Sequence, residues 1–184
     1  MDRKPRVAFI CTHNSCRSQI AEALGKWYGK DVIDTYSAGT EIADQINPKA
    51  VAAMQEVYEV DMTQDQYPKT LDDIPAVDIA VSMGCGVQCP VSLATFYEDW
   101  GIEDPTGKDD EAYLDTIYLL EEKVKYLIDQ IIQGHYAFEE LDEDPTAIYD
   151  EDMAWDEKAS GDPIESEELE YESDVSEERL DQEH

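Results

Sequence analysis

An apolar stretch of four residues, Val7-Ala8-Phe9-Ile10, leads directly into a small and polar run and then into a helical pattern. The polar run begins at Cys11 and holds Arg17 six positions later. A loop between a strand end and a helix start points several backbone N–H groups at one spot, where they and the helix dipole favour negative charge. Residues 6–28 are therefore expected to fold as a strand, an anion-binding loop and a helix in succession.

The residue types in this loop suit a tetrahedral oxyanion. We expect the local field to favour the thiolate of Cys11, a candidate nucleophile, and Arg17 to offer two N–H donors to the anion. A Cys and an Arg at this spacing also arise by chance, and a buried cysteine is usually part of a core, but the position between strand and helix favours the oxyanion loop. The residues expected to surround the anion are Thr12, His13, Asn14, Ser15, Cys16 and Arg17.

Apolar segments alternate with amphipathic ones over the first 138 residues, which predicts an α/β domain with a parallel sheet. Strands are expected at 6–11, 32–36, 77–82 and 94–97, with Ser37-Ala38-Gly39-Thr40 as a turn. Helices are expected at 18–28, from Asn47-Pro48 onward, at 70–74 and at 109–133, with Gly134 as a stop. The first helix is predicted to bury Ile20, Ala21, Leu24 and Trp27.

Charge divides the 184-residue chain, whose net charge is −32. Residues 139–184 hold 21 acidic and two basic residues, a net charge of −19, without sustained periodicity. Such a segment cannot bury enough apolar surface to fold alone, so we expect a catalytic domain at 1–138 and a disordered acidic tail at 139–184. A partner-binding role for the tail is the alternative.

Composition excludes several classes of function. The acidity disfavours nucleic-acid partners and anionic membranes, and the sequence has no apolar run of about 18 residues that could span a membrane. The N-terminal apolar run is too short for a secretory signal. Four cysteines without such a signal point to thiol chemistry in a reducing compartment, so a cytoplasmic location is expected.

Two further cysteines, Cys85 and Cys89, lie four positions apart in a glycine-containing segment after the third expected strand. Together with Cys11 they could form a relay that passes a disulfide from the active site to the surface. A zinc site is a competing interpretation, because Cys11, Cys16, Cys85 and Cys89 make four thiolates. Inert, partly buried cysteines are a third.

Asp104-Pro105 lies in a loop after the fourth expected strand, and the carboxyl ends of parallel strands share one edge of a sheet. In isolation an Asp-Pro pair is ordinary turn chemistry. Beside a nucleophilic cysteine and an arginine, Asp104 is a candidate general acid for a departing oxygen.

Several segments together resemble the thioredoxin-coupled arsenate reductases, which share the fold of the low-molecular-weight protein tyrosine phosphatases. The resemblance covers about residues 6–133. It is carried by the segments 11–24, Tyr36-Ser37-Ala38-Gly39, Asn47-Pro48-Lys49-Ala50, Met83-Gly84-Cys85 through Cys89-Pro90, and Asp99-Trp100-Gly101 through Asp104-Pro105-Thr106-Gly107.

The resemblance implies a four-stranded parallel sheet flanked by helices. It implies Cys11 as nucleophile, Arg17 as oxyanion anchor, Ser18 as partner of the Cys11 thiolate, and Asp104 as acid. Cys85 and Cys89 would be the second and third redox cysteines, and Cys16 a loop cysteine without a necessary catalytic role.

The resemblance also implies a substrate and an electron source. The substrate would be arsenate, with phosphate or sulfate as a mimic, and electrons would come from thioredoxin or a similar thiol donor, with no tightly bound cofactor. Some members of the family hold a potassium ion near the loop, and Asn14, Glu22 and Ser37 match part of that site.

Two departures from the family pattern bear on function. His13 stands where phosphatases have glycine, and the spacing of Cys85 and Cys89 is shorter than in some reductases. The alternative enzyme is a phosphatase that forms a phosphocysteine at Cys11 and needs neither Cys85 nor Cys89. An inactive oxyanion-binding protein is an alternative from another class, which the joint presence of Cys11, Arg17 and Asp104 disfavours.

Overall fold

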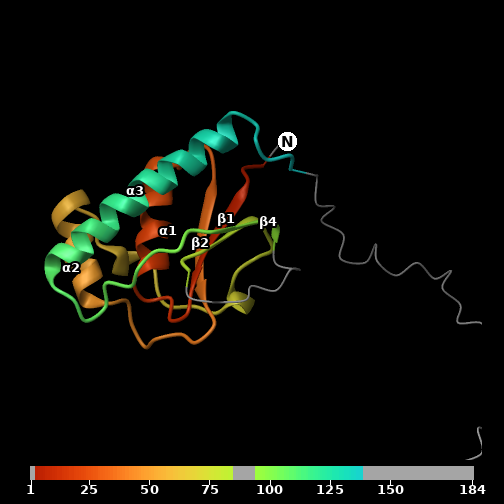
Figure 1. Cartoon of the computed structure of the whole chain (residues 1–184). Helices are drawn as coiled ribbons and strands as arrows, with labels where there is room; N and C mark the ends of the chain where they lie inside the picture. The colour runs from red at the N-terminus through yellow and green to blue at the C-terminus, as the bar shows by residue number, and fades with distance from the viewer. Residues whose placement is uncertain (1–2, 85–93, 139–184) are drawn as a thin grey trace, which may run out of the picture. The chain divides into compact units, whose positions relative to one another are not determined.

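The computed structural model describes residues 3–84 and 94–138. In this part of the chain, strands and helices alternate as the sequence predicts (Figure 1). In chain order the elements are β1 (Arg6–Cys11), α1 (Arg17–Tyr28), β2 (Asp34–Gly39), α2 (Pro48–Tyr58), the 3-10 turns η1 (Met62–Gln64) and η2 (Leu71–Asp73), β3 (Val77–Ser82), β4 (Ala94–Asp99) and α3 (Asp110–Ile132).

The four strands form one parallel sheet in the order β2-β1-β3-β4. Their register aligns the carboxyl ends: Cys11 lies opposite Gly39, Ile10 opposite Ser82, and Ser82 opposite Asp99. Since ligands in open α/β sheets bind outside the carboxyl ends of the strands, this edge is where a site is expected.

The main core lies between the sheet and the three α-helices, which gather on one side of it (Figure 1). Alternate residues of β1 and β3 enter this core, including Phe9 and Ile79, and they meet Leu24 of α1 and Leu120 of α3. The opposite face packs a smaller cluster around Ala8, Ile10 and Ala80, with Leu71 of η2 against it. This packing confirms the predicted α/β class and the four-stranded parallel sheet.

Local signals set the helix ends. The Asn47 side chain accepts hydrogen bonds from the Lys49 and Ala50 amides, and Pro48 occupies the first helical position of α2. Asp109 caps α3 in the same way, through the Ala112 amide. Gly134 follows α3 with a φ of 76°, a left-handed conformation that glycine adopts without strain.

Two predictions about local structure are wrong. Ser37–Gly39 is not a turn but the end of β2, because these small residues pair with Phe9–Cys11 of β1. Trp27, on the last turn of α1, is 55% exposed, and its ring packs edge-on against the Tyr58 ring at 5.9 Å between centroids. The expectations for the tail at 139–184, and hence the domain boundary, lie outside the described residues.

Within the described ranges, no helix is both long enough and apolar enough to cross a membrane.

The buried carboxylate of Asp78 links the start of β3 to the N-terminal segment. It is 2% exposed, receives two N–H bonds from Arg3 at 2.8 and 2.9 Å, and accepts the Arg6 amide at 2.6 Å. Burial by itself raises the pKa of Asp78, but the hydrogen bonds from Arg3 and Arg6 outweigh it and hold the pKa below 3.8.

We expect Asp78→Asn to lower the free energy of unfolding by roughly 2 kcal/mol at pH 7, because one partner of a buried ion pair is lost. The depressed pKa means that this stabilisation is present above the unfolded pKa of about 3.9 and disappears as the pH falls through the folded pKa. Urea denaturation should therefore show a gap in the free energy of unfolding between wild type and variant at pH 7, and this gap should close as the pH falls through the folded pKa of Asp78. The exposed Asp72→Asn is the control; an equal loss in both variants would contradict the role of Asp78.

Candidate active site

The loop at residues 12–16 joins the end of β1 to the start of α1. Cys16 precedes the first residue of α1, and no side chain caps that end of the helix. The first N–H groups of a helix have no partner within it. Because a side-chain cap is absent here, these groups and the helix dipole are available to an anion in the loop.

The Cys11 sulfur is buried, 3% exposed, and lies within reach of two donors. It is 2.8 Å from the Ser18 hydroxyl oxygen and 3.2 Å from the Asn14 amide nitrogen. The Asn14 side-chain amide donates to the same Ser18 oxygen at 2.9 Å, which leaves the Ser18 hydrogen free to point at the sulfur. The loop thus directs a hydroxyl and a backbone N–H at the sulfur.

Asn14 holds the loop in shape. Its φ of 48° lies in the left-handed region, which costs a residue with a side chain on the order of 1–3 kcal/mol. The buried side-chain oxygen accepts from Gln19 Nε2 at 3.0 Å and from the Lys69 amide at 2.9 Å. These bonds, together with the one to Ser18, offset the strain and fix the direction of the Asn14 amide that meets the sulfur.

The end of β2 passes very close to the loop at Gly39. A Cβ atom at this position would lie 2.7 Å from the Thr12 carbonyl oxygen and 2.9 Å from the Asn14 amide nitrogen. Both neighbours are backbone atoms of the loop and cannot move aside cheaply. Glycine is therefore required at position 39 by the close approach of two backbones.

The Arg17 side chain spans the rim of the site. Its Nη1 donates to the Ile102 carbonyl at 2.7 Å and more weakly to that of Met83 at 3.4 Å, and its Nη2 pairs with Asp104 at 2.8 Å. In the described part of the chain, Arg17 Nε is the one buried side-chain nitrogen or oxygen without a hydrogen-bond partner. An unsatisfied buried donor costs about 1–3 kcal/mol, which an incoming anion would recover.

Asp104 is ionised in this arrangement. Burial by itself raises the pKa of Asp104, but hydrogen bonds from the Thr106 backbone and side chain and the charge of Arg17 outweigh it and hold the pKa below its ordinary 3.8. The Thr106 amide donates to Oδ1 at 3.0 Å and Arg17 binds Oδ2. A general acid must carry a proton, so Asp104 can act as one only after its surroundings change.

Cys16 is a second buried cysteine of the loop, beside Cys11. Burial raises the pKa of the Cys16 thiol to about 12, and the nearby Asp104 and Cys11 act in the same direction. Cys16 is therefore a neutral thiol at physiological pH and contributes backbone to the loop. Cys85 and Cys89 lie outside the described residues.

The resemblance implies that Asn14, Glu22 and Ser37 form part of a potassium site. Ser37 donates to Glu22 at 2.5 Å, and Lys69 connects Asn14 to Glu22, because its amide donates to Asn14 and its ammonium to Glu22. The side-chain oxygens of Asn14 and Glu22, however, already accept from protein donors, among them Lys69 Nζ on Glu22 at 3.3 Å. Across residues 3–84 and 94–138, no three His, Cys, Asp or Glu side chains are grouped so as to hold a metal ion.

Sequence reasoning missed the residues that support the loop from behind. Gln19 and Lys69 donate hydrogen bonds to the Asn14 side chain, and Gly39 leaves space for the loop backbone. Neither Gln19 nor Lys69 belongs to a sequence motif that would have indicated this role. Gly39, at the end of β2, is a usable signal of such a close approach, but its small neighbours also fit a turn. These positions acquire their roles only when β2 and the segment before η2 pack on the loop.

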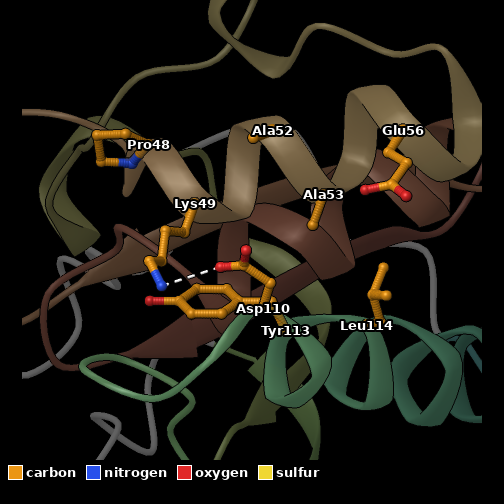
Figure 2. Close-up of a pocket in the computed structure, with 8 residues that line it drawn as sticks. All are labelled: Pro48, Lys49, Ala52, Ala53, Glu56, Asp110, Tyr113 and Leu114. Carbon is orange, nitrogen blue, oxygen red and sulfur yellow. Dashed lines mark hydrogen bonds and ion pairs between the residues drawn. The ribbon is translucent and has the colours of Figure 1, made fainter.

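A separate hollow of about 370 Å³ lies between α2 and α3 and contains none of the predicted site residues (Figure 2). Across it Lys49 of α2 pairs with Asp110 of α3 at 2.9 Å. The hollow holds no cysteine, and its lysine is already paired with Asp110, so the loop beside Cys11 remains the candidate site. Its lining consists of Pro48, Lys49, Ala52, Ala53, Glu56, Asp110, Tyr113 and Leu114.

Known proteins share this fold and loop. The family described as low molecular weight phosphotyrosine protein phosphatase matches residues 6–137. A glutaredoxin arsenate reductase of Synechocystis is 36% identical over 130 residues, which cover 68% of this chain and 98% of that protein. A solved arsenate reductase in a phosphate-binding state superposes with a TM-score of 0.64 at 35% identity, covering 69% of this chain and 98% of the other.

A thioredoxin-dependent arsenate reductase of Corynebacterium glutamicum superposes with a TM-score of 0.59 at 32% identity, over 72% of this chain and 64% of that one. The chain therefore belongs to the low molecular weight phosphotyrosine protein phosphatase family, within its group of thiol-coupled arsenate reductases. This confirms the resemblance found in the sequence.

Proposed function

We propose that this protein reduces arsenate to arsenite with electrons from its own thiols, which a thioredoxin-like or glutaredoxin-like donor restores. The observation that carries the proposal is the pairing of a buried sulfur that accepts two donors, Cys11, with a buried arginine donor that has no partner, Arg17 Nε. In this proposal a tetrahedral oxyanion binds to both, at the start of α1 that no side chain caps. The relatives named arsenate reductases support arsenate as that anion.

The first step is nucleophilic attack. Arsenate binds the loop amides of residues 12–17 and Arg17, and the Cys11 thiolate forms a sulfur–arsenic bond. One arsenic–oxygen bond breaks, and the oxygen leaves as water once it has been protonated. Ser18 stabilises the thiolate before attack through its hydroxyl at 2.8 Å.

Asp104 supplies the proton for that oxygen. When arsenate draws the Arg17 guanidinium toward itself, Asp104 loses its ion-pair partner at 2.8 Å and gains a neighbouring negative charge. Both changes raise the pKa of Asp104 above the depressed value it has in the free protein. The acid is thus protonated in the complex and ionised without substrate.

The electrons come from the cysteines. Cys85 attacks the Cys11 sulfur, the sulfur–arsenic bond breaks, and its electron pair leaves with arsenite. Cys89 then attacks Cys85, which frees Cys11 and leaves a Cys85–Cys89 disulfide for the external donor. Gly84 follows the carboxyl end of β3, where its amide donates to the Ser82 hydroxyl at 3.1 Å, and Cys85 is the next residue in the sequence. The need for reduced thiols supports a cytoplasmic location as part of this proposal.

The test is arsenate turnover, followed by NADPH oxidation, with thioredoxin and its reductase in one arm and glutaredoxin with glutathione and its reductase in the other. Hydrolysis of p-nitrophenyl phosphate is measured in parallel. We expect multiple turnovers of arsenate in at least one arm. Efficient ester hydrolysis with no arsenate reduction in either arm would instead favour a phosphatase that acts through a phosphocysteine at Cys11.

We expect Asp104→Asn to lower kcat for arsenate about 100-fold with little change in KM, because the lost group acts on the leaving oxygen. The wild-type kcat should fall as the pH rises through the pKa of Asp104 in the complex, and the variant should lack this fall. Glu103→Gln, an exposed neighbour paired only with Lys108, is the control. A variant that keeps the wild-type pH profile would exclude Asp104 as the acid.

A further inference from the structure

The Glu22 carboxylate is buried behind the loop and has two cationic partners. It is 4% exposed. Lys26 Nζ lies 2.9 Å from one of its oxygens, and Lys69 Nζ lies 3.3 Å from the other, which also accepts the Ser37 hydroxyl. A carboxylate so far from water needs this compensation, since an unpaired buried charge costs several kcal/mol.

Lys69 is the more deeply buried of the two lysines. Its side chain is 10% exposed, against 36% for Lys26. Besides Glu22, the ammonium donates to the Tyr67 carbonyl at 3.2 Å and lies 5.1 Å from the centre of the Tyr67 ring. The ammonium is thus held in a fixed place by a carboxylate, a carbonyl and a π face.

The backbone of the same residue supports the catalytic loop. The Lys69 amide donates to the Asn14 side-chain oxygen at 2.9 Å, and the Lys69 carbonyl accepts from Gly39 at 2.9 Å. Asn14 in turn points its amide at the Cys11 sulfur. A displacement of Lys69 would therefore shift the Asn14 side chain, and with it the backbone amide that meets the Cys11 sulfur.

A monovalent cation in this place would seek oxygens of the same kind, a carboxylate, a carbonyl and hydroxyls. The residues that match part of a potassium site do not leave room for one: both Glu22 oxygens and the Asn14 oxygen already have protein donors. We propose that the Lys69 ammonium is a built-in cation that takes the place of potassium and holds the oxyanion loop in its binding shape. The proposal rests on this loop being the oxyanion site proposed above.

The consequence is independence from potassium. In wild type, phosphate affinity and thermal midpoint should be the same in potassium chloride and in choline chloride at equal ionic strength, because no metal cation is bound. In Lys69→Met, which keeps much of the side-chain volume but removes the charge, phosphate affinity should fall about 10-fold in choline chloride. Potassium should restore part of the affinity and raise the midpoint, by filling the vacated place beside Glu22.

Phosphate binding is measured by calorimetry, and unfolding by circular dichroism, each in potassium, sodium and choline chloride. The matched control is Lys30→Met, which removes an exposed lysine four positions after Lys26. In this variant, phosphate affinity and the thermal midpoint should not depend on the cation. Neither measurement needs arsenate reduction, so a failed turnover assay would count against the proposed function and leave this proposal standing.

Three results would overturn the proposal: potassium-dependent phosphate affinity in wild type, undiminished affinity of Lys69→Met in choline chloride, or a loss in Lys69→Met that no cation repairs. If Lys69→Met does not fold, the double variant Glu22→Gln/Lys69→Met decides, since it removes the buried negative charge as well. Folding and phosphate binding of the double variant without potassium support the charge role of Lys69. A double variant that also fails to fold would show that Lys69 serves packing instead.

Discussion

Cys11→Ser is expected to abolish arsenate turnover, with a loss on the order of 10⁵-fold, because a serine hydroxyl stays protonated and cannot enter a disulfide. The substitution is nearly isosteric, and the hydroxyl can keep the contacts now made to Ser18 at 2.8 Å and to the Asn14 amide at 3.2 Å. Fold and phosphate binding should therefore survive. Arsenite release measured by mass spectrometry and phosphate binding measured by calorimetry separate the two properties.

Alkylation gives an independent check on the same residue. Iodoacetamide at pH 7 should modify Cys11 and leave Cys16 intact, since burial raises the pKa of the Cys16 thiol to about 12. Bound phosphate should protect Cys11. An intact turnover rate in Cys11→Ser, or preferential labelling of Cys16, would show that the nucleophile has been misassigned.

Cys85→Ser and Cys89→Ser should each reduce arsenate turnover from many cycles to one at most, and they should stop at different points. Without Cys85 the sulfur–arsenic adduct on Cys11 has no attacking thiol, so no arsenite is released. Without Cys89 a single arsenite leaves, and a Cys11–Cys85 disulfide remains. Quench experiments that count arsenite per protein, with mass spectrometry of the peptides, distinguish these end states.

Ester hydrolysis is the internal control for the relay, since it needs only Cys11, Arg17 and Asp104. Any rate of p-nitrophenyl phosphate hydrolysis seen in wild type should persist in Cys85→Ser and Cys89→Ser. In oxidised wild type the expected linkage is Cys85–Cys89. Finding both cysteines as free thiols after arsenate turnover would contradict the relay, whereas loss of ester hydrolysis would point to a damaged loop.

In the proposed mechanism, the pairing of Arg17 with Asp104 links substrate binding to acid catalysis. In the free protein the two side chains pair at 2.8 Å, which helps to hold the pKa of Asp104 below its ordinary value. We propose that an oxyanion competes with Asp104 for the guanidinium and thereby raises the pKa of the acid. This competition would let a carboxyl whose pKa is depressed in the free protein donate a proton in the complex.

Short-range patterns in the sequence predict the helices and strands, and they predict the loop that carries Cys11 and Arg17. Residues Arg6–Cys11 form the predicted strand, the caps at Asn47 and Asp109 start helices, and Cys11 and Arg17 lie at the two ends of one loop. These features depend on residues close together in the chain: side-chain periodicity, capping and the geometry of a strand–loop–helix unit. The α/β class followed from their alternation.

Tertiary packing decided what the short-range pattern could not. The end of β2 became strand instead of turn because β1 offered a partner for Ser37–Gly39. Arg17 meets Asp104 across 87 positions, and Lys69 reaches Asn14 across 55. Such contacts arise only when the parallel strands align their carboxyl ends and bring distant loops to one edge. The burial of Glu22, and so the need for a fixed cation beside it, exists only in the folded chain.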